Sequence, residues 1–220
     1  MSKRKIALVH TSPAAIGPLM QYYGEAAPEL EITNLLDDGI LRLFRRKDEA
    51  TAFERLASLI EAARDAYCVE LALVTCSSVS MGLLNRLRPK AGIPLLKIDE
   101  PMARLAVRSG RRVGIAVTFP PTLEPTSRLL TDAAQEAQVE ITLVPELIDL
   151  AYEALLSART AEHDRLLLDG MERLVRKNVD VIVLAQVSMA RILPQAQERF
   201  SMPVLTSLDT SLSAVRAILK

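Results

Sequence analysis

The sequence repeats itself at an interval of about 110 residues, and this repeat constrains the fold more than any other feature. Val69-Glu-Leu-Ala-Leu-Val-Thr-Cys76 matches Val179-Asp-Val-Ile-Val-Leu-Ala-Gln186 at an offset of 110. Repetition at a steady interval indicates two copies of one structural unit. Four more matches keep the same order, at offsets of 107, 109, 110 and 109; they begin at Ile6 and Val113, Glu31 and Glu140, Glu54 and Asp164, and Gly92 and Ser201.

Each copy alternates short apolar runs with segments whose apolar residues recur every three or four positions, as in 53–63 and 166–175. This alternation is typical of βαβ units, and continuous apolar strands are buried on both faces. We predict an α/β fold with two pseudo-symmetric halves, each a four-stranded parallel sheet flanked by helices. The expected strands are Lys5–His10, Glu31–Leu35, Leu71–Thr75, Pro94–Ile98, Arg112–Val117, Glu140–Val144, Asp180–Ala185 and Pro203–Thr206.

The repeat places the expected boundary between the halves at 110/111, giving residues 1–110 and 111–220. Helices near Asp99–Gly110 and at the C-terminus are candidates for crossing over between the halves. Open α/β sheets bind ligands at the carboxyl ends of their strands. We therefore expect the ligand in an interdomain cleft lined by the loops that follow the strands.

Composition excludes several classes of protein. Lys and Arg together number 27, as do Asp and Glu, and there is no Trp, so nothing predicts a surface for nucleic acid. No apolar run is long enough for a membrane span or a signal peptide, which makes the cytoplasm the expected compartment. No metal-ligand spacing or glycine-rich phosphate loop occurs, so we expect neither metal nor cofactor. Apolar outer helix faces are compatible with a homodimer, which composition alone does not decide.

Hydroxyl side chains gather at four expected strand-to-helix junctions. Such residues cap helices, and the unpaired N–H groups at a helix start attract anions. A set of these junctions would suit the carboxylate of a small substrate. The residues that we expect to line the site are Thr11, Ser12, Thr75, Ser77, Ser78, Thr118, Thr122, Val187 and Ser188.

Cys76 is the strongest candidate for a reactive group. It follows an expected buried strand and is expected to open a helix, a position that favours the thiolate. A thiolate can remove a proton or act as a nucleophile. Cys68, at the other end of the same strand, is interpreted as structural, and roughly 26 Å of extended chain excludes a disulfide between the two. His10 ends the first strand, where a histidine is more often a packed residue than a functional one. His163 is expected to be solvated.

Together these features resemble the aspartate/glutamate/hydantoin racemase superfamily. The resemblance rests on the repeat, on Leu-Val-Thr75-Cys76-Ser77-Ser78, on Ile93-Pro94 leading into Ile98-Asp99-Glu100, and on Val117-Thr118 with Thr122. It implies two α/β halves, no cofactor, and a pair of cysteines that flank the α-carbon of a small carboxylate. One cysteine takes the proton, and the other returns a proton on the opposite face.

The resemblance assigns Cys76 to the first family cysteine and Gln186 to the place of the second. It assigns Ser12, Ser77, Thr118 and Thr122 to substrate-binding hydroxyls, with Ser188 two residues beyond the second cysteine position. A glutamine amide donates and accepts hydrogen bonds but is not a base at neutral pH. The two-thiol mechanism is therefore not available to this chain as it stands.

Three interpretations remain open at this point. In the first, Cys76 alone carries out isomerisation, cis–trans isomerisation or decarboxylation, while Gln186 binds a substrate oxygen. In the second, a racemase uses another base, with His10 and Asp209 as candidates, the latter matching Glu100 in the repeat. In the third, the protein binds a small carboxylate without turnover.

Overall fold

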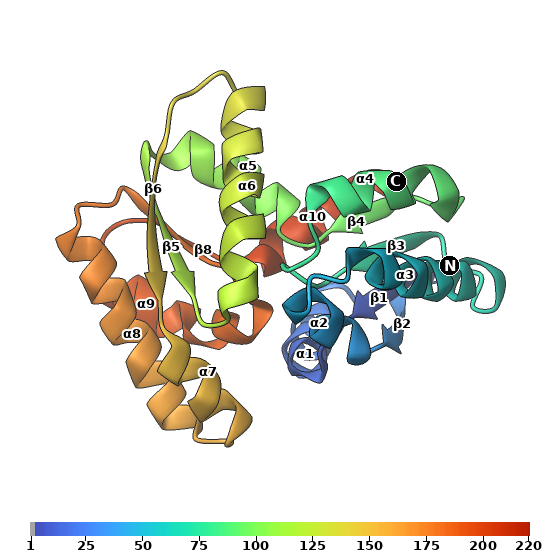
Figure 1. Cartoon of the computed structure of the whole chain (residues 1–220), viewed down its shortest axis with the longest axis horizontal. Helices are drawn as coiled ribbons and strands as arrows, with labels where there is room; N and C mark the ends of the chain where they lie inside the picture. The colour runs from blue at the N-terminus through green and yellow to red at the C-terminus, as the bar shows by residue number, and fades with distance from the viewer. Residues whose placement is uncertain (1–2) are drawn as a thin grey trace. The chain divides into compact units, whose positions relative to one another are not determined.

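The computed structural model describes residues 3–220, which form two compact units (Figure 1). The first unit holds the described residues up to Ile98 together with Leu208–Lys220, and the second holds Asp99–Ser207. This division differs from equal halves because helix α5 (Glu100–Ser109) groups with the second unit. The C-terminal helix α10 (Ser207–Ile218) groups, from Leu208 onward, with the first. The first unit is therefore built from two separate stretches of chain.

The sheet of the first unit has four parallel strands in the order β2-β1-β3-β4. Its two central strands carry the continuous apolar runs Ile6–Val9 and Leu71–Val74, so both faces must be covered by helices. The strands are β1 (Arg4–His10), β2 (Leu30–Leu36), β3 (Leu71–Val74) and β4 (Leu95–Lys97). The helices are η1 (Pro13–Ala15), α1 (Ile16–Ala26), α2 (Gly39–Arg45), α3 (Glu49–Asp65) and α4 (Met81–Ala91), with α10.

Side chains of the central strands alternate between two buried faces. Ala7, Val9, Ala72 and Val74 belong to a core cluster with apolar residues of α2, α3 and α4. Their strand neighbours Ile6, Leu8, Leu71 and Leu73 point to the opposite face and are also fully buried. The sequence prediction of strands covered on both sides is confirmed.

The second unit repeats this topology in the order β6-β5-β7-β8, again with all strands parallel. Helices α6 and α8 both contact β5 and lie on opposite sides of the sheet (Figure 1). The strands are β5 (Arg112–Val117), β6 (Thr142–Leu147), β7 (Val181–Leu184) and β8 (Val204–Leu205). The helices are α5, α6 (Pro120–Glu136), α7 (Asp149–Leu156), α8 (Thr160–Arg176), η2 (Val187–Ile192) and α9 (Leu193–Arg199).

All eight expected strands occur, and the predicted fold class is confirmed. The largest displacement is in β6, which begins and ends two to three residues later than predicted and contains Pro145. Proline cannot donate to a neighbouring strand, so it is tolerated in a strand at the edge of a sheet. Strand β6 is such an edge strand, bonded only to β5.

His163 differs from its sequence prediction, because its side chain is fully buried in α8. Its Nδ1 lies 2.9 Å from the Asp164 carboxylate, and Arg191 lies 3.2 Å from the other oxygen of that carboxylate. The pair thus connects α8 to η2 rather than projecting into solvent. Among residues 3–220, no helix is long and apolar enough to cross a membrane, and no cluster of acidic, His or Cys side chains could hold a metal ion.

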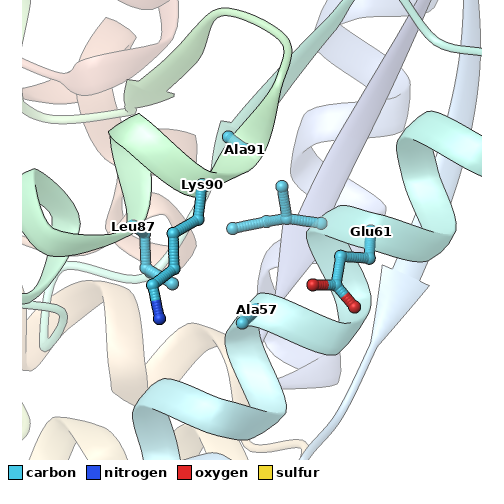
Figure 2. A pocket seen from close by; sticks show the side chains of 6 residues that line it. Ala57, Glu61, Leu87, Lys90 and Ala91 are labelled. Carbon is cyan, nitrogen blue, oxygen red and sulfur yellow. The ribbon is translucent and has the colours of Figure 1, made fainter.

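A small surface hollow lies between α3 and α4 (Figure 2). Ala57 and Glu61 from α3 face Leu87, Lys90 and Ala91 from α4. These residues occupy the C-terminal half of α4, whereas the strand ends that carry the candidate site precede the start of that helix. The hollow is therefore separate from the candidate site.

Candidate active site at the strand ends

In the first unit, the candidate residues lie where two neighbouring strands end. Strands β1 and β3 pair in register from Ile6 with Leu71 to Val9 with Val74, so the segments that follow them emerge side by side. Thr11 and Ser12 follow β1, and Thr75–Ser78 follow β3. The fold thereby brings Thr11 and Ser12 next to four residues that follow about 65 positions later in the sequence.

The surroundings of Cys76 differ from the expected helix start. The segment after β3 forms a turn in which Val79 N donates to Cys76 O at 3.2 Å, and α4 begins only at Met81. Its cap is Ser80, whose Oγ accepts from Leu83 N at 3.1 Å. The prediction that Cys76 opens a helix is therefore wrong, and helix α4 does not present its first N–H groups from that residue. The thiol-bearing residue is 9% exposed, whereas Cys68 is exposed.

Thr75 and His10 form one buried network. Thr75 Oγ1 lies 2.8 Å from His10 Nδ1 and 3.2 Å from Val9 O, and His10 Nε2 lies 2.9 Å from Asn34 Oδ1. Asn34 Nδ2 donates to Met20 Sδ, which leaves its oxygen to accept from the ring. His10 Nε2 is then the protonated nitrogen of the neutral ring, so Nδ1 and Val9 O share the one hydroxyl proton of Thr75.

This network engages both nitrogens of His10, which is fully buried. Burial lowers the pKa of His10, and the hydrogen bond with Asn34 offsets part of that effect. The neutral ring is thus favoured, and its acceptor nitrogen already has a donor. The geometry supports a packed structural role for His10 more than that of a second base. It also directs the Thr75 hydroxyl to His10 and Val9 O.

Thr11 and Ser12 have different surroundings. Ser12 caps η1, because its Oγ accepts from Ala14 N at 3.3 Å. Thr11 is 2% exposed, and its Oγ1 has no hydrogen-bond partner among residues 3–220. A buried hydroxyl without a partner is unusual and carries a desolvation penalty. Thr11 is therefore a polar group at the end of β1 that a bound ligand could satisfy.

Lys97, the last residue of β4, is a charged group at this site that the sequence analysis missed. Its side chain is fully buried, and its Nζ donates to the carbonyl oxygen of Ser77 at 3.4 Å. Strand β4 pairs with β3, with Lys97 beside Val74. A lysine is therefore placed next to the turn that holds Cys76.

In the second unit, Gln186 joins the ends of two neighbouring strands. Its Oε1 accepts from Thr118 N at 3.1 Å, and its Nε2 donates to Thr118 Oγ1 at 3.0 Å. Thr118 follows β5, Gln186 follows β7, and Thr118 is 1% exposed. A backbone N–H only donates, so the amide oxygen must face it and the orientation of the amide is fixed.

This clamp leaves two donor protons for a ligand. One N–H of the Gln186 amide and the hydroxyl proton of Thr118 have no acceptor among the described residues. Neither group takes up a proton near neutral pH. The Gln186 position can thus hold a negatively charged oxygen, and it offers no base.

The remaining predicted residues of the second unit lie beside this clamp. Thr122 is in the first turn of α6 and 2% exposed, and Val187 and Ser188 open η2. Helix α6 begins after Phe119 with no side-chain cap, and η2 likewise lacks one. The expectation that hydroxyls at these two junctions cap the following helix is therefore wrong.

Asp209, the other candidate for a second base, lies in α10. Its carboxylate accepts a hydrogen bond from the hydroxyl of Tyr22 in α1. The neighbouring pair Tyr23 and Ser211 links the same two helices at 3.0 Å. Asp209 is thus part of the contact between α1 and α10 rather than of the strand ends that hold Cys76.

Comparison with known proteins identifies a family. The family model described as Asp/Glu/Hydantoin racemase matches residues 23–215. Among curated proteins, the glutamate racemase of Vibrio vulnificus (strain YJ016) is 26% identical over 167 residues, which cover 76% of this chain. The match spans 62% of the length of that relative.

Solved structures share the fold at lower sequence identity. The allantoin racemase from Klebsiella pneumoniae is 20% identical, with a TM-score of 0.71 over 99% of this chain and 88% of that one. An unliganded arylmalonate decarboxylase is 16% identical, with a TM-score of 0.63 over 98% of this chain and 93% of that one. The two-unit architecture is therefore common to these proteins.

Proposed function

Because the chain belongs to the Asp/Glu/hydantoin racemase family, we propose that it transfers a proton at the α-carbon of a small carboxylate, with Cys76 as its only catalytic thiol. The proposal includes no cofactor. It assigns Cys76, at the first family cysteine position, as the base, and Gln186, at the second, with Thr118 as donors to the substrate.

One observation carries the single-thiol proposal: the Gln186 amide is held by Thr118, and an amide takes up no proton near neutral pH. Inversion at carbon by two bases needs a proton acceptor on one face and a proton donor on the other. His10 and Asp209 are both engaged in contacts of their own. Among the three candidates for moving the proton, Cys76 is then the one left.

In the proposed step, one thiol both removes the proton and returns one. The Cys76 thiolate takes the α-proton, the electrons of the C–H bond pass into an enolate, and the thiol formed returns a proton to the same face. The Gln186 N–H and the Thr118 hydroxyl stabilise the enolate oxygen, because fixed donors are most effective where charge develops. Buried Thr11 is a candidate for binding the substrate carboxylate.

A second reaction suits the same groups. In a malonate-type acid, a departing carboxyl group leaves as carbon dioxide, and the electrons of the broken C–C bond remain as the enolate. A Cys76 thiol then delivers a proton to one face. The clamp favours this candidate because decarboxylation needs an oxygen-binding group and one acid, but no second base.

The test is proton exchange followed by NMR in heavy water. The panel would contain glutamate, allantoin, an aryl malonate, a hydroxy acid and an unsaturated dicarboxylate. We expect exchange, isomerisation or decarboxylation of at least one class by the parent and by Cys68→Ala, and none by Cys76→Ala. Cys68 is a matched control because it is a thiol of the same unit that is exposed.

Two results would contradict the proposal. Activity retained in Cys76→Ala would assign the chemistry to another group. A ligand that raises the melting temperature, with no exchange of any acid in the panel, would instead indicate a protein that binds carboxylates without turning them over.

A further inference from the structure

Lys97 is the largest charged side chain that the fold buries completely. It ends β4, where Leu95 and Ile98 flank it in a buried apolar run. Lysine is among the residues least often buried, because taking an ammonium group out of water is costly without compensating interactions. The position at the carboxyl end of the strand, rather than in its middle, places this charge at the same end of the sheet as Cys76.

One contact of Lys97 is with the backbone of the Cys76 turn. Its Nζ donates to Ser77 O at 3.4 Å, one residue beyond the thiol. Strand β3, which leads into Cys76, is the neighbour of β4, with Val74 paired to Lys97. The ammonium group therefore adjoins the turn from the side of β4, while the thiol-bearing residue is 9% exposed.

A reactive thiol at Cys76 needs a source of positive potential. Burial in apolar surroundings disfavours a thiolate, and adjacent cations or helix starts favour it. Helix α4 begins at Met81 and is capped by Ser80, so it does not start at Cys76. The buried lysine is a source that the structure does place beside the turn.

We propose that Lys97 is a positioning residue that favours the thiolate of Cys76 and fixes the turn through the carbonyl group of Ser77. The inference rests on the proposed function, since it explains how the single thiol of that function becomes a base. It adds a residue that reacts with nothing itself and acts through Cys76.

Other charged or titratable groups on the elements around this turn differ in their contacts. Arg88 of α4 donates to Leu95 O at 3.2 Å, at the opposite end of β4. His10 of β1 is held by Thr75 and Asn34. Asp99 and Glu100 follow β4 after Ile98, Asp99 is 1% exposed, and their carboxylates would oppose the effect of the ammonium. The experiment therefore measures the net effect of Lys97 in the whole protein.

The experiment follows alkylation of Cys76 by iodoacetamide against pH, in a Cys68→Ser background without substrate. Replacing Lys97 with Met keeps the length of the stem and removes the charge. We expect the alkylation profile of Lys97→Met to move upward by about one pH unit, a tenfold change in the thiolate fraction. The rate at pH 7 should fall about threefold, since a more basic thiolate is also more nucleophilic.

Two further variants serve as controls. Lys97→Arg keeps the charge and should restore most of the profile. Lys90→Met makes the same substitution in α4, where the ammonium is exposed and lies 5.0 Å from the centre of the Phe53 ring, and should leave the profile unchanged.

An unchanged profile in folded Lys97→Met would overturn the inference, even if the protein exchanges substrate protons. If Lys97→Met fails to fold, Lys97→Gln takes its place, because it removes the charge and keeps a side-chain donor for Ser77 O. An unchanged alkylation profile in folded Lys97→Gln, compared with the parent in the Cys68→Ser background, would then refute the inference.

Discussion

Replacing Gln186 with Leu should destabilise the second unit, because the amide of Gln186 satisfies a buried backbone group. Leucine has a similar volume but accepts no hydrogen bond. The change removes the bond from Thr118 N at 3.1 Å and the bond to Thr118 Oγ1 at 3.0 Å. Thr118 is 1% exposed, so its N–H finds no water in exchange.

The magnitude follows from these two bonds. Each neutral hydrogen bond contributes about 1 kcal/mol, and a buried donor left without a partner costs about 1–3 kcal/mol. We therefore expect the free energy of unfolding to fall by about 2–4 kcal/mol. Gln186→Glu is the matched control, because a carboxylate still accepts from Thr118 N and can also accept from the Thr118 hydroxyl. Its loss should stay below about 1 kcal/mol.

Two assays check this prediction. Urea unfolding followed by circular dichroism gives the change in stability, and hydrogen exchange by NMR reports on the Thr118 amide itself. In Gln186→Leu that amide should lose its protection while the amides within β5 keep theirs. A stability within 0.5 kcal/mol of the parent, with the Thr118 amide still protected, would refute the clamp.

Three further changes test other parts of the structure. Because burial lowers the pKa of His10, the unfolded state binds more protons below about pH 6.5, so stability should fall as the pH drops through that region, by at most about 1.4 kcal/mol per pH unit. His10→Gln should lack this component in urea titrations between pH 7 and 5, and a parent without it would contradict the burial effect. Ser80→Ala removes the cap of α4 and should cost about 1 kcal/mol of unfolding free energy, whereas Ser213→Ala, at an exposed position in α10, should cost almost nothing. Gln186→Cys should add inversion at the α-carbon to the activity of the parent, and a variant that is folded but never inverts an acid which the parent exchanges would argue against a shared substrate.

The architecture was predictable because its signal is repeated. Strands such as Leu71–Val74 and Val181–Leu184 are apolar throughout, and the same pattern recurs about 110 residues later. Strand β6 was placed less accurately, since an edge strand has one neighbour, tolerates Pro145 and carries a weaker pattern. The chain division was also harder to predict, because repeat spacing does not say which unit a terminal helix joins.

The candidate site was predicted in part. Strand ends that are neighbours in a sheet place Thr11 near Thr75 and Thr118 near Gln186. The start of α4 was missed because Ser77, Ser78 and Ser80 are all plausible caps, and only three-dimensional geometry selects Ser80. Sequence spacing alone does not tell which of these hydroxyl residues caps the helix.

Lys97 and the Gln186 clamp needed the structure. A lysine after an apolar run is normally interpreted as the exposed end of a strand, yet Lys97 is fully buried. The one available signal was its place within Leu95-Leu96-Lys97-Ile98, between apolar residues on both sides. The clamp joins Gln186 to Thr118, 68 positions away, and no local pattern reports which partner a glutamine amide will take.

The most direct test of the central claim compares exchange with inversion. An enantiomerically pure acid from the active class would be incubated in heavy water, with deuterium followed by NMR and configuration by chiral chromatography. A single thiol acting on one face predicts deuterium at the α-carbon with the starting configuration retained, and neither change in Cys76→Ala. Inversion at the same rate as exchange would contradict the account, because it requires a second base on the opposite face.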